Sequence, residues 1–172
     1  MPCYLFTFHG YGTQLPDSSS GYVSRDFVRP RGYVRCREGL LAPDANMATY
    51  YRRNLLHDPV RFSHLMQEQM LAAAIEAFRF QELRGHYIAT ESTHIHLLVS
   101  WRSNAAWQLV RRRLANSLTR RLDREFERRP WFAKQPSRKQ VRDRRHFDYL
   151  MTTYMPKLSG LKWREGQGVL GD

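Results

Sequence analysis

Two neighbouring segments, 86–91 and 93–101, constrain the fold of this chain more than any other feature. Residues 93–101 read Thr-His-Ile-His-Leu-Leu-Val-Ser-Trp, and residues 86–91 have the same apolar and β-branched character. Both patterns are typical of strands. Only the short Ser92-Thr93 turn separates them, so we expect an antiparallel hairpin at the centre of a sheet.

Long amphipathic segments flank this hairpin. Apolar residues recur at spacings of three and four over 60–80 and again over 105–128, which predicts two helices. Residues 4–12 begin as an aromatic strand that stops at glycines, residues 131–142 have room for one further strand, and residues 143–154 predict a last helix. The order predicts an α+β fold, a ferredoxin-like split β-α-β arrangement with an antiparallel sheet, plus a C-terminal helix that bears tyrosines.

The length of 172 residues fits one domain, which we expect to span 1–172. Residues 13–60 are rich in Gly, Pro, Ser and Arg with weak periodicity, so we interpret them as an irregular insertion. No apolar run is long enough to span a membrane, and residues 1–6 lack the pattern of a signal peptide. A cytoplasmic location is the resulting expectation.

The net charge of +12, with a pI near 10.3, indicates a polyanionic partner. Most of the basic residues are arginines, whose planar side chains pair with phosphate and stack on bases. The alternative is a solvated basic surface without a specific partner. Two basic runs are the candidate DNA-binding residues: Arg111, Arg112, Arg113, Arg120, Arg121, Arg138, Lys139, Arg142, Arg144 and Arg145.

His94 and His96 lie two residues apart on the clearest strand. Alternation places both imidazoles on one face, roughly 7 Å apart along the backbone, where they can share a divalent metal ion. A phosphodiester-cleaving enzyme uses such an ion to polarise the phosphoryl oxygen. The pair alone is also compatible with two histidines that only make hydrogen bonds on a sheet face.

Tyrosines near the end of the chain supply a candidate nucleophile. A phenolate can attack a DNA phosphate and form a phosphotyrosine intermediate. Tyr149 and Tyr154 are five residues apart, so on an α-helix they point in different directions and at most one faces the metal. The alternative for either residue is an aromatic side chain that packs the helix onto the sheet.

The ordered set of motifs resembles the single-tyrosine HUH transposases, and most closely the REP-associated tyrosine transposases and their relatives. The resemblance covers most of residues 1–165. It rests on four segments: 4–13, the histidine block 89–101, the stretch 117–122 and the tyrosine stretch 146–160.

The resemblance implies a specific chemistry. Members of this family hold Mg or Mn with the two histidines, which correspond to His94 and His96 here. Their tyrosine cleaves single-stranded DNA at the foot of a hairpin, keeps the 5′ phosphate and releases a 3′ hydroxyl before strand transfer. They often work as homodimers with shared active sites, so a homodimer is expected here.

The resemblance favours Tyr154 as the nucleophile, with Tyr149 as the alternative. Tyr154 lies just before Pro156, as the tyrosine of the family commonly precedes a proline near the end of its helix. A polar residue one turn later often completes the metal site, but Leu158 follows Tyr154 and Thr153 follows Tyr149. Two further functions stay open: a non-catalytic, decayed or domesticated protein that binds single-stranded nucleic acid, and a hydrolytic metal-dependent nuclease.

Overall fold

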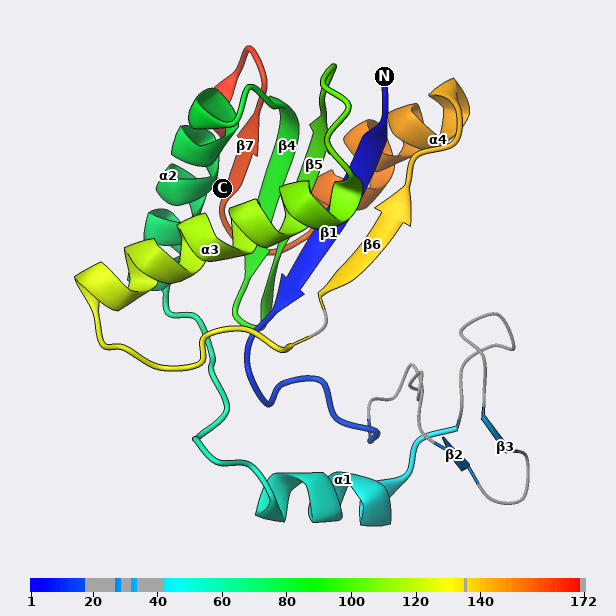
Figure 1. Cartoon of the computed structure of the whole chain (residues 1–172), viewed down its shortest axis with the longest axis vertical. Helices are drawn as coiled ribbons and strands as arrows, with labels where there is room; N and C mark the ends of the chain where they lie inside the picture. The colour runs from blue at the N-terminus through cyan, green and yellow to red at the C-terminus, as the bar shows by residue number, and fades with distance from the viewer. Residues whose placement is uncertain (18–26, 29–31, 34–41, 135, 171–172) are drawn as a thin grey trace.

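The computed structural model describes residues 1–17, 27–28, 32–33, 42–134 and 136–170. Its centre is a six-stranded sheet in the order β6-β1-β5-β4-β7-β8, in which every neighbouring pair is antiparallel (Figure 1). The strands are β1 (Cys3–His9), β4 (Arg84–Glu91), β5 (His94–Ser100), β6 (Ser137–Gln140), β7 (Lys162–Arg164) and β8 (Gly168–Leu170). The α+β class and the antiparallel sheet expected from the sequence are confirmed.

Four α-helices accompany the sheet in the described residues: α1 (Ala45–Arg53), α2 (His64–Phe80), α3 (Trp107–Glu125) and α4 (Arg144–Tyr149). A π-helix at Leu150–Tyr154 and a 3₁₀-helix at Met155–Lys157 continue directly from α4. Side-chain caps explain where several helices begin. The Asp44, Ser63 and Asp143 side chains accept hydrogen bonds from backbone N–H groups in the first turns of α1, α2 and α4.

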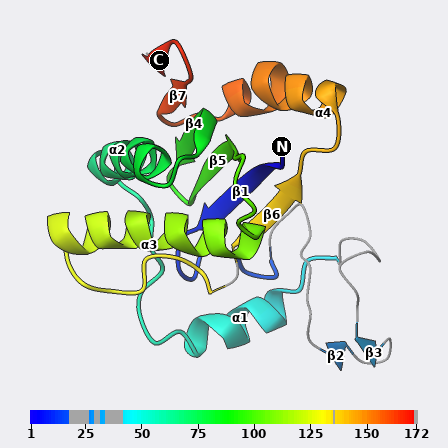
Figure 2. The same cartoon turned by 45° about the horizontal axis from the view of Figure 1, so that its top comes forward.

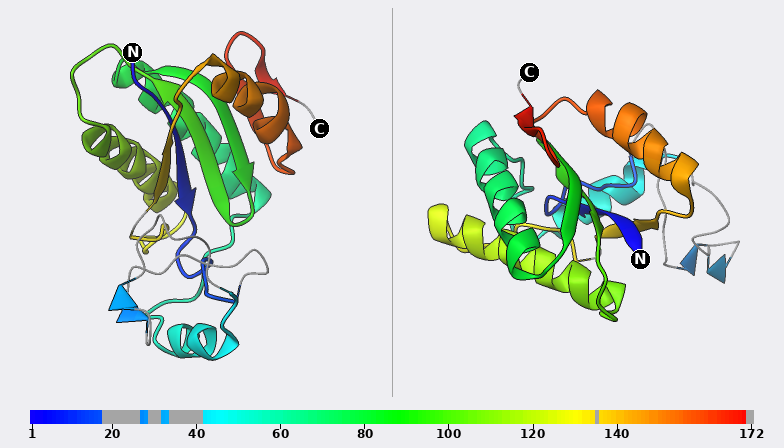
Figure 3. Two further views of the ribbon diagram at one scale, coloured as in Figure 1. Left: turned by 90° about the vertical axis from the view of Figure 1, so that its right-hand side faces the viewer. Right: turned by 90° about the horizontal axis from the view of Figure 1, so that it is seen from above.

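The helices divide between the two faces of the sheet. Helices α2 and α3 lie side by side on one face, and α4 with the segment that follows it lies on the other (Figures 2 and 3). The strands supply both faces by alternation. Phe6, Leu97 and Ile88 pack in the larger core under α2 and α3, whereas Leu5 and Leu98 pack in a smaller core under the α4 segment.

Parts of the chain are more regular than the sequence indicated. Helix α1 lies inside the segment 13–60, which was expected to be irregular, and a two-stranded pair, β2 (Phe27–Val28) and β3 (Gly32–Tyr33), lies there too. Residues 18–26, 29–31 and 34–41 of that insertion lie outside the described part. The C-terminal tail adds β7 and β8 to the edge of the sheet, where no strand was expected.

Within the described residues, no helix is both long enough and apolar enough to cross a membrane.

Candidate active site

The register of the central strands gathers polar side chains on the face that α4 covers. His9 of β1 pairs with His94 of β5, and His94 pairs with Glu91 of β4. In the next row, Thr7 pairs with His96. Because side chains alternate along a strand, both rows lie on the same face as Leu5 and Leu98. Three strands therefore place His9, Thr7, Glu91 and His96 around His94.

His94 and His96 lie on one face, as their spacing predicts. Their ring centroids are 4.6 Å apart, and Ile95 between them is completely buried in the opposite core. Threonine hydroxyls orient both rings: Nδ1 of His96 is hydrogen-bonded to Thr7 Oγ1 at 2.7 Å, and Nδ1 of His94 to Thr93 Oγ1 at 2.9 Å. These contacts leave the Nε2 atoms for other partners, an arrangement that resembles the outer-shell support of metal-binding histidines.

His9 belongs to the same cluster, although it was not among the site residues expected from the sequence. Its ring centroid is 5.2 Å from that of His94. The sequence signal that could have found it is the position of His9 at the end of β1, which pairs with the start of β5. His9 and His94 are far apart in the sequence, so their contact could not be predicted from local pattern.

Burial keeps the three imidazoles neutral. Burial first, and then the neighbouring His94, lower the pKa of His9 to about 4. Burial first, and then His94 and His9, lower the pKa of His96 to about 3. Burial also lowers the pKa of His94, against an opposing effect of Glu91. At neutral pH the rings therefore carry lone pairs and no charge, the form in which imidazole binds a metal.

The donor chemistry of this face fits a divalent ion, although no complete ligand set is assembled. Nowhere in the described ranges do three or more His, Cys, Asp or Glu side chains converge as a metal site. Glu91 is the acidic neighbour of the histidine pair, with its Oε2 atom 3.5 Å from Nε2 of His94. Two neutral imidazoles beside one carboxylate are a suitable donor set for Mn, and the carboxylate also suits Mg.

Tyr154 reaches this cluster from the segment after α4. Its hydroxyl lies 3.5 Å from Nε2 of His96, and the ring centroids of Tyr154 and His96 are 5.5 Å apart. Leu150 and Met155 on either side are buried in the smaller core, which fixes the segment on the sheet. Tyr154 and His96 belong to the same chain, and the expected homodimer with shared active sites stays a prediction.

The expectation that Tyr149 and Tyr154 point in different directions is wrong. Residues 150–154 form a π-helix, whose i→i+5 repeat returns Tyr154 to the side of Tyr149. The ring centroids of the two tyrosines are 6.5 Å apart. An uninterrupted α-helix would separate them by roughly 140° around its axis. Of the two tyrosines, Tyr154 places its hydroxyl beside His96, while the side chain of Tyr149 is half exposed.

The end of the tyrosine segment is tied to the histidine strands. Glu91 Oε1 accepts hydrogen bonds from the backbone N–H and the hydroxyl of Ser159, at 3.2 and 3.4 Å. Gly160 follows, and a Cβ atom at that position would lie 1.9 Å from the carbonyl oxygen of Thr90. Only glycine permits this approach, so Ser159 and Gly160 form a clamp that holds the segment beside His94.

The Tyr154 hydroxyl is not activated by its protein surroundings. Burial, then the negative charge of Glu91, and then the proximity of Tyr149 raise the pKa of Tyr154 above its ordinary value. Ionisation at neutral pH therefore requires an added positive charge near the oxygen, such as a metal ion.

The candidate DNA-binding residues fall into two groups. Arg111, Arg112, Arg113, Arg120 and Arg121 lie on α3, on the face of the sheet opposite the histidines. Two of these have protein partners: Arg121 pairs with Glu76 at 2.6 Å, and Arg111 donates to the carbonyl of Pro136 at 3.0 Å. The α3 group therefore does not border the histidine cluster.

The second group lies nearer the tyrosine. Lys139 pairs with Leu5, which places it on the histidine face, and Arg142, Arg144 and Arg145 are exposed at the start of α4. The Arg144 Nε–H group donates to both carboxylate oxygens of Asp148, at 2.9 and 3.0 Å. Arg138 points to the other face and stacks on Trp107, 3.8 Å from the ring centroid. Lys162, which the sequence analysis did not name, pairs with Ala89 in the row of His96.

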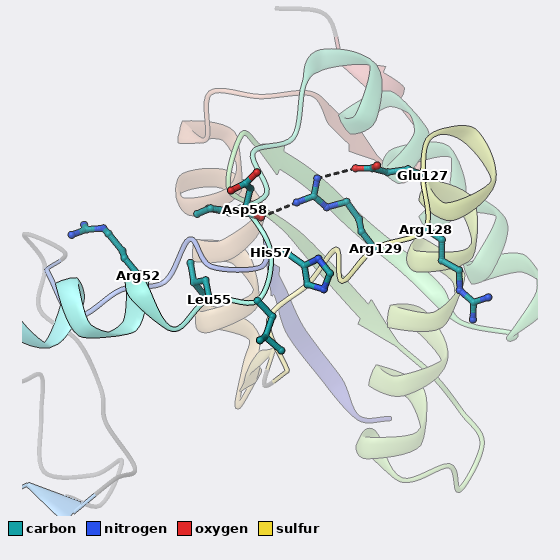
Figure 4. Close-up of a pocket in the computed structure, with 9 residues that line it drawn as sticks. Arg52, Leu55, His57, Asp58, Glu127, Arg128 and Arg129 are labelled. Atoms are coloured by element: carbon teal, nitrogen blue, oxygen red, sulfur yellow. Dashed lines mark hydrogen bonds and ion pairs between the residues drawn. The ribbon is translucent and has the colours of Figure 1, made fainter.

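A separate hollow of about 490 Å³ lies between the end of α1 and the loop after α3 (Figure 4). Arg129 crosses it, donating to Glu127 at 2.9 Å and to the carbonyl of Asp58 at 2.8 Å. Arg52 and Arg128 line the same hollow. It contains neither the histidines nor the tyrosines, so it is separate from the candidate active site.

Comparisons with known proteins add little beyond this geometry. No family model matches the chain, and no curated protein matches it. Among solved structures, the chain is similar to a REP-associated tyrosine transposase bound to a REP hairpin, at 8% identity and a TM-score of 0.46. The match covers 87% of this chain and 62% of that chain, so this chain spans less than two thirds of that structure.

Proposed function

We propose that this protein is a metal-assisted DNA endonuclease and transposase, which cleaves and rejoins single-stranded DNA at hairpins through a phosphotyrosine at Tyr154. The observation that carries the proposal is the approach of the Tyr154 hydroxyl to Nε2 of His96, at 3.5 Å. It supports the proposal because a nucleophile and a pair of neutral imidazoles meet on one face.

In the proposed cleavage step, the Tyr154 oxygen attacks the phosphorus atom and the bond to the 3′ oxygen breaks. The phenol proton passes to Glu91, whose negative charge acts on Tyr154. One proton is then transferred to the departing 3′ oxygen. The products are a 5′-phosphotyrosine and a free 3′ hydroxyl. Attack by another 3′ hydroxyl reverses the exchange and rejoins the DNA. One phosphodiester replaces another, so the cycle consumes no proton.

Nε2 of His94 and Nε2 of His96 would hold the Mg or Mn ion in this proposal, with Glu91 or water in a further position. Such an ion supplies positive charge that polarises the phosphoryl oxygen and favours the phenolate. The chain contributes orientation: Thr7 and Thr93 hold the two rings by Nδ1. The clamp at Ser159 and Gly160 keeps the tyrosine segment on the sheet.

The proposed DNA path follows the cations on the tyrosine side, namely Lys139, Arg142 and Arg145. All three are exposed and suited to phosphate contacts. The order β6-β1-β5-β4, with α2 after β1 and α3 after β5, supports a ferredoxin-like core. That fold is common among nucleic-acid binders and does not by itself decide the function.

The test is a denaturing gel of protein incubated with labelled single-stranded hairpin DNA from around its own gene, with Mn or Mg. We expect a labelled protein band in the wild type and in Tyr149→Phe. The band disappears in Tyr154→Phe, which loses one oxygen atom and keeps its ring, and in His96→Ala. Retention of the band in Tyr154→Phe would overturn the assignment of the nucleophile.

One set of observations favours a second candidate function, a protein that binds single-stranded nucleic acid without cleaving it. Leu158 stands where the family has a polar residue, no three acidic or histidine ligands converge within the described residues, and the pKa of Tyr154 is raised. This candidate predicts salt-sensitive binding with neither cleavage nor a protein band. Cleavage without the band identifies a hydrolytic nuclease instead.

A further inference from the structure

Tyr149 is the exposed aromatic of the tyrosine segment. Its side chain is 51% exposed, whereas Leu150 and Met155 are buried beneath the same segment and Phe147 packs against the smaller core. A large aromatic ring that stays in water forgoes the usual gain from burial. Its exposure beside a candidate nucleophile therefore calls for a role that the folded chain alone does not supply.

The π-helix is what brings Tyr149 to this position. Without the extra residue per turn, Tyr149 and Tyr154 would point in different directions. With it, the two ring centroids are 6.5 Å apart and the ring planes are tilted by 34°. π-Helical turns are rare and concentrate at functional sites.

The open side of the Tyr149 ring is free to receive a flat ligand. The guanidinium groups that lie over aromatic rings in the described residues contact Trp107, Trp131 and Phe147, and none covers Tyr149. No hydrogen bond joins the Tyr149 hydroxyl to another group in the described part of the chain. The ring face, and not the hydroxyl, is therefore the available feature.

We propose that Tyr149 is a DNA-binding residue, on which the unpaired base next to the phosphate attacked by Tyr154 stacks. This inference rests on the proposed function and deepens it. A base is the ligand that fits, because stacking on an exposed aromatic ring beside exposed cations is how proteins hold single-stranded nucleic acid. Arg145 and Lys157, both exposed near the segment, suit the flanking phosphates.

A second nucleophile is the competing role for Tyr149. The distances argue against it, since the hydroxyl that lies 3.5 Å from His96 belongs to Tyr154. The two roles also respond differently to substitution. Tyr149→Phe keeps the stacking face and removes the nucleophilic oxygen, whereas Tyr149→Leu removes the face and keeps an apolar side chain.

The experiment uses the full chain and the same hairpin oligonucleotides, with 2-aminopurine replacing each single-stranded base at the foot in turn. Stacking on an aromatic ring quenches this base, and fluorescence anisotropy on the same samples reports binding. We expect position-specific quenching with wild type and Tyr149→Phe. In Tyr149→Leu the quenching disappears and binding weakens by about 5- to 100-fold. Tyr50→Leu is the matched control, because Tyr50 is 66% exposed on α1.

The outcomes separate this inference from the proposed function. Unchanged quenching and affinity in Tyr149→Leu, with the Tyr154 adduct still formed, overturn the stacking role and leave the function standing. Loss of the adduct in Tyr149→Phe, with quenching retained, would assign the nucleophile to Tyr149 and overturn the role of Tyr154 on which this inference rests. If quenching depends on the Tyr149 ring but no adduct forms, the stacking role is supported and the proposed cleavage function is overturned. A wild type that binds no single-stranded DNA overturns both.

Discussion

The two faces of the sheet are made by the same strands and differ in almost every property. Under α2 and α3, β1 and β5 contribute only apolar side chains, among them Phe6, Phe8 and Leu97, all completely buried. Under the α4 segment, the alternate residues of the same strands include Thr7, His94 and His96. One strand can therefore serve stability on one side and chemistry on the other.

The covering elements differ in the same way. Helices α2 and α3 have 17 and 19 residues, and present continuous apolar stripes to the sheet. Helix α4 has six residues and passes into π and 3₁₀ turns. Polar groups on the second face reduce the apolar area available for packing, and the irregular helix orients its tyrosines instead. The comparison predicts that stability and activity respond to different residues of one strand.

The largest expected effect is on stability, from Leu97→Ala on the apolar face. Leu97 is completely buried in the larger core, so the substitution leaves a cavity and costs about 2–5 kcal/mol of unfolding free energy. Urea unfolding measures it. The control is Leu56→Ala, because Leu56 is 88% exposed, and there we expect a change within about 0.5 kcal/mol. Equal effects of the two substitutions would contradict the assigned core.

The next effect concerns the adjacent residue on the other face. In His96→Gln we expect the rate of adduct formation, per folded molecule, to fall by more than about 100-fold, since loss of a ligand exceeds loss of its outer-shell partner. Manganese affinity, followed by electron paramagnetic resonance, should fall in parallel. An adduct rate within about 10-fold of wild type would remove His96 from the proposed machinery.

Thr7→Val tests the support beneath the site. It conserves volume at a buried position and removes the hydroxyl that is hydrogen-bonded to Nδ1 of His96 at 2.7 Å. We expect the adduct rate to fall by about 10- to 100-fold, by analogy with outer-shell partners of metal ligands. Thr49→Val on α1 is the control, because its hydroxyl donates to the backbone carbonyl of Ala45 and Thr49 is exposed. The proposed support fails if the two valine variants react equally fast.

The last prediction is a dependence of stability on pH that comes from the histidine face. Burial lowers the pKa of His9 to about 4 and of His96 to about 3, below the ordinary value of 6.5. Below about pH 6.5, His9 and His96 therefore bind protons in the unfolded chain but stay neutral in the folded chain. Stability is greatest above about pH 6.5 and falls as the pH drops toward about 4.

Urea midpoints between about pH 7.5 and about pH 5 measure this slope. His9→Gln removes one of the groups responsible, so its slope should be shallower than that of the wild type. An identical slope in the variant would show that His9 does not titrate as its burial predicts.

Much of the framework could be predicted because it depends on local pattern. The hairpin of β4 and β5, helices α2 and α3, and the shared face of His94 and His96 all follow from periodicity within one segment. Capping side chains such as Ser63 then set the helix starts to within a few residues of the expected positions.

The remainder depends on contacts between distant segments or on irregular backbone. His9 meets His94 through strand pairing, and the tail forms β7 and β8 only because β4 offers an edge. The predicted directions of Tyr149 and Tyr154 were wrong because a 3.6-residue repeat was assumed throughout the last helix, where the structure has a π-helix. Helix propensity does not indicate where one extra residue is inserted into a single helical turn.

The clamp at Ser159 and Gly160 has a consequence for reaction order. It fastens the tyrosine segment to the strands of its own chain, so one molecule contains every residue that the proposed chemistry uses. Adduct formation at saturating DNA should then be first order in protein, and its half-time should not change on dilution. A half-time that lengthens on dilution would mean that two chains exchange their tyrosines, and that the clamp must open before DNA is cut.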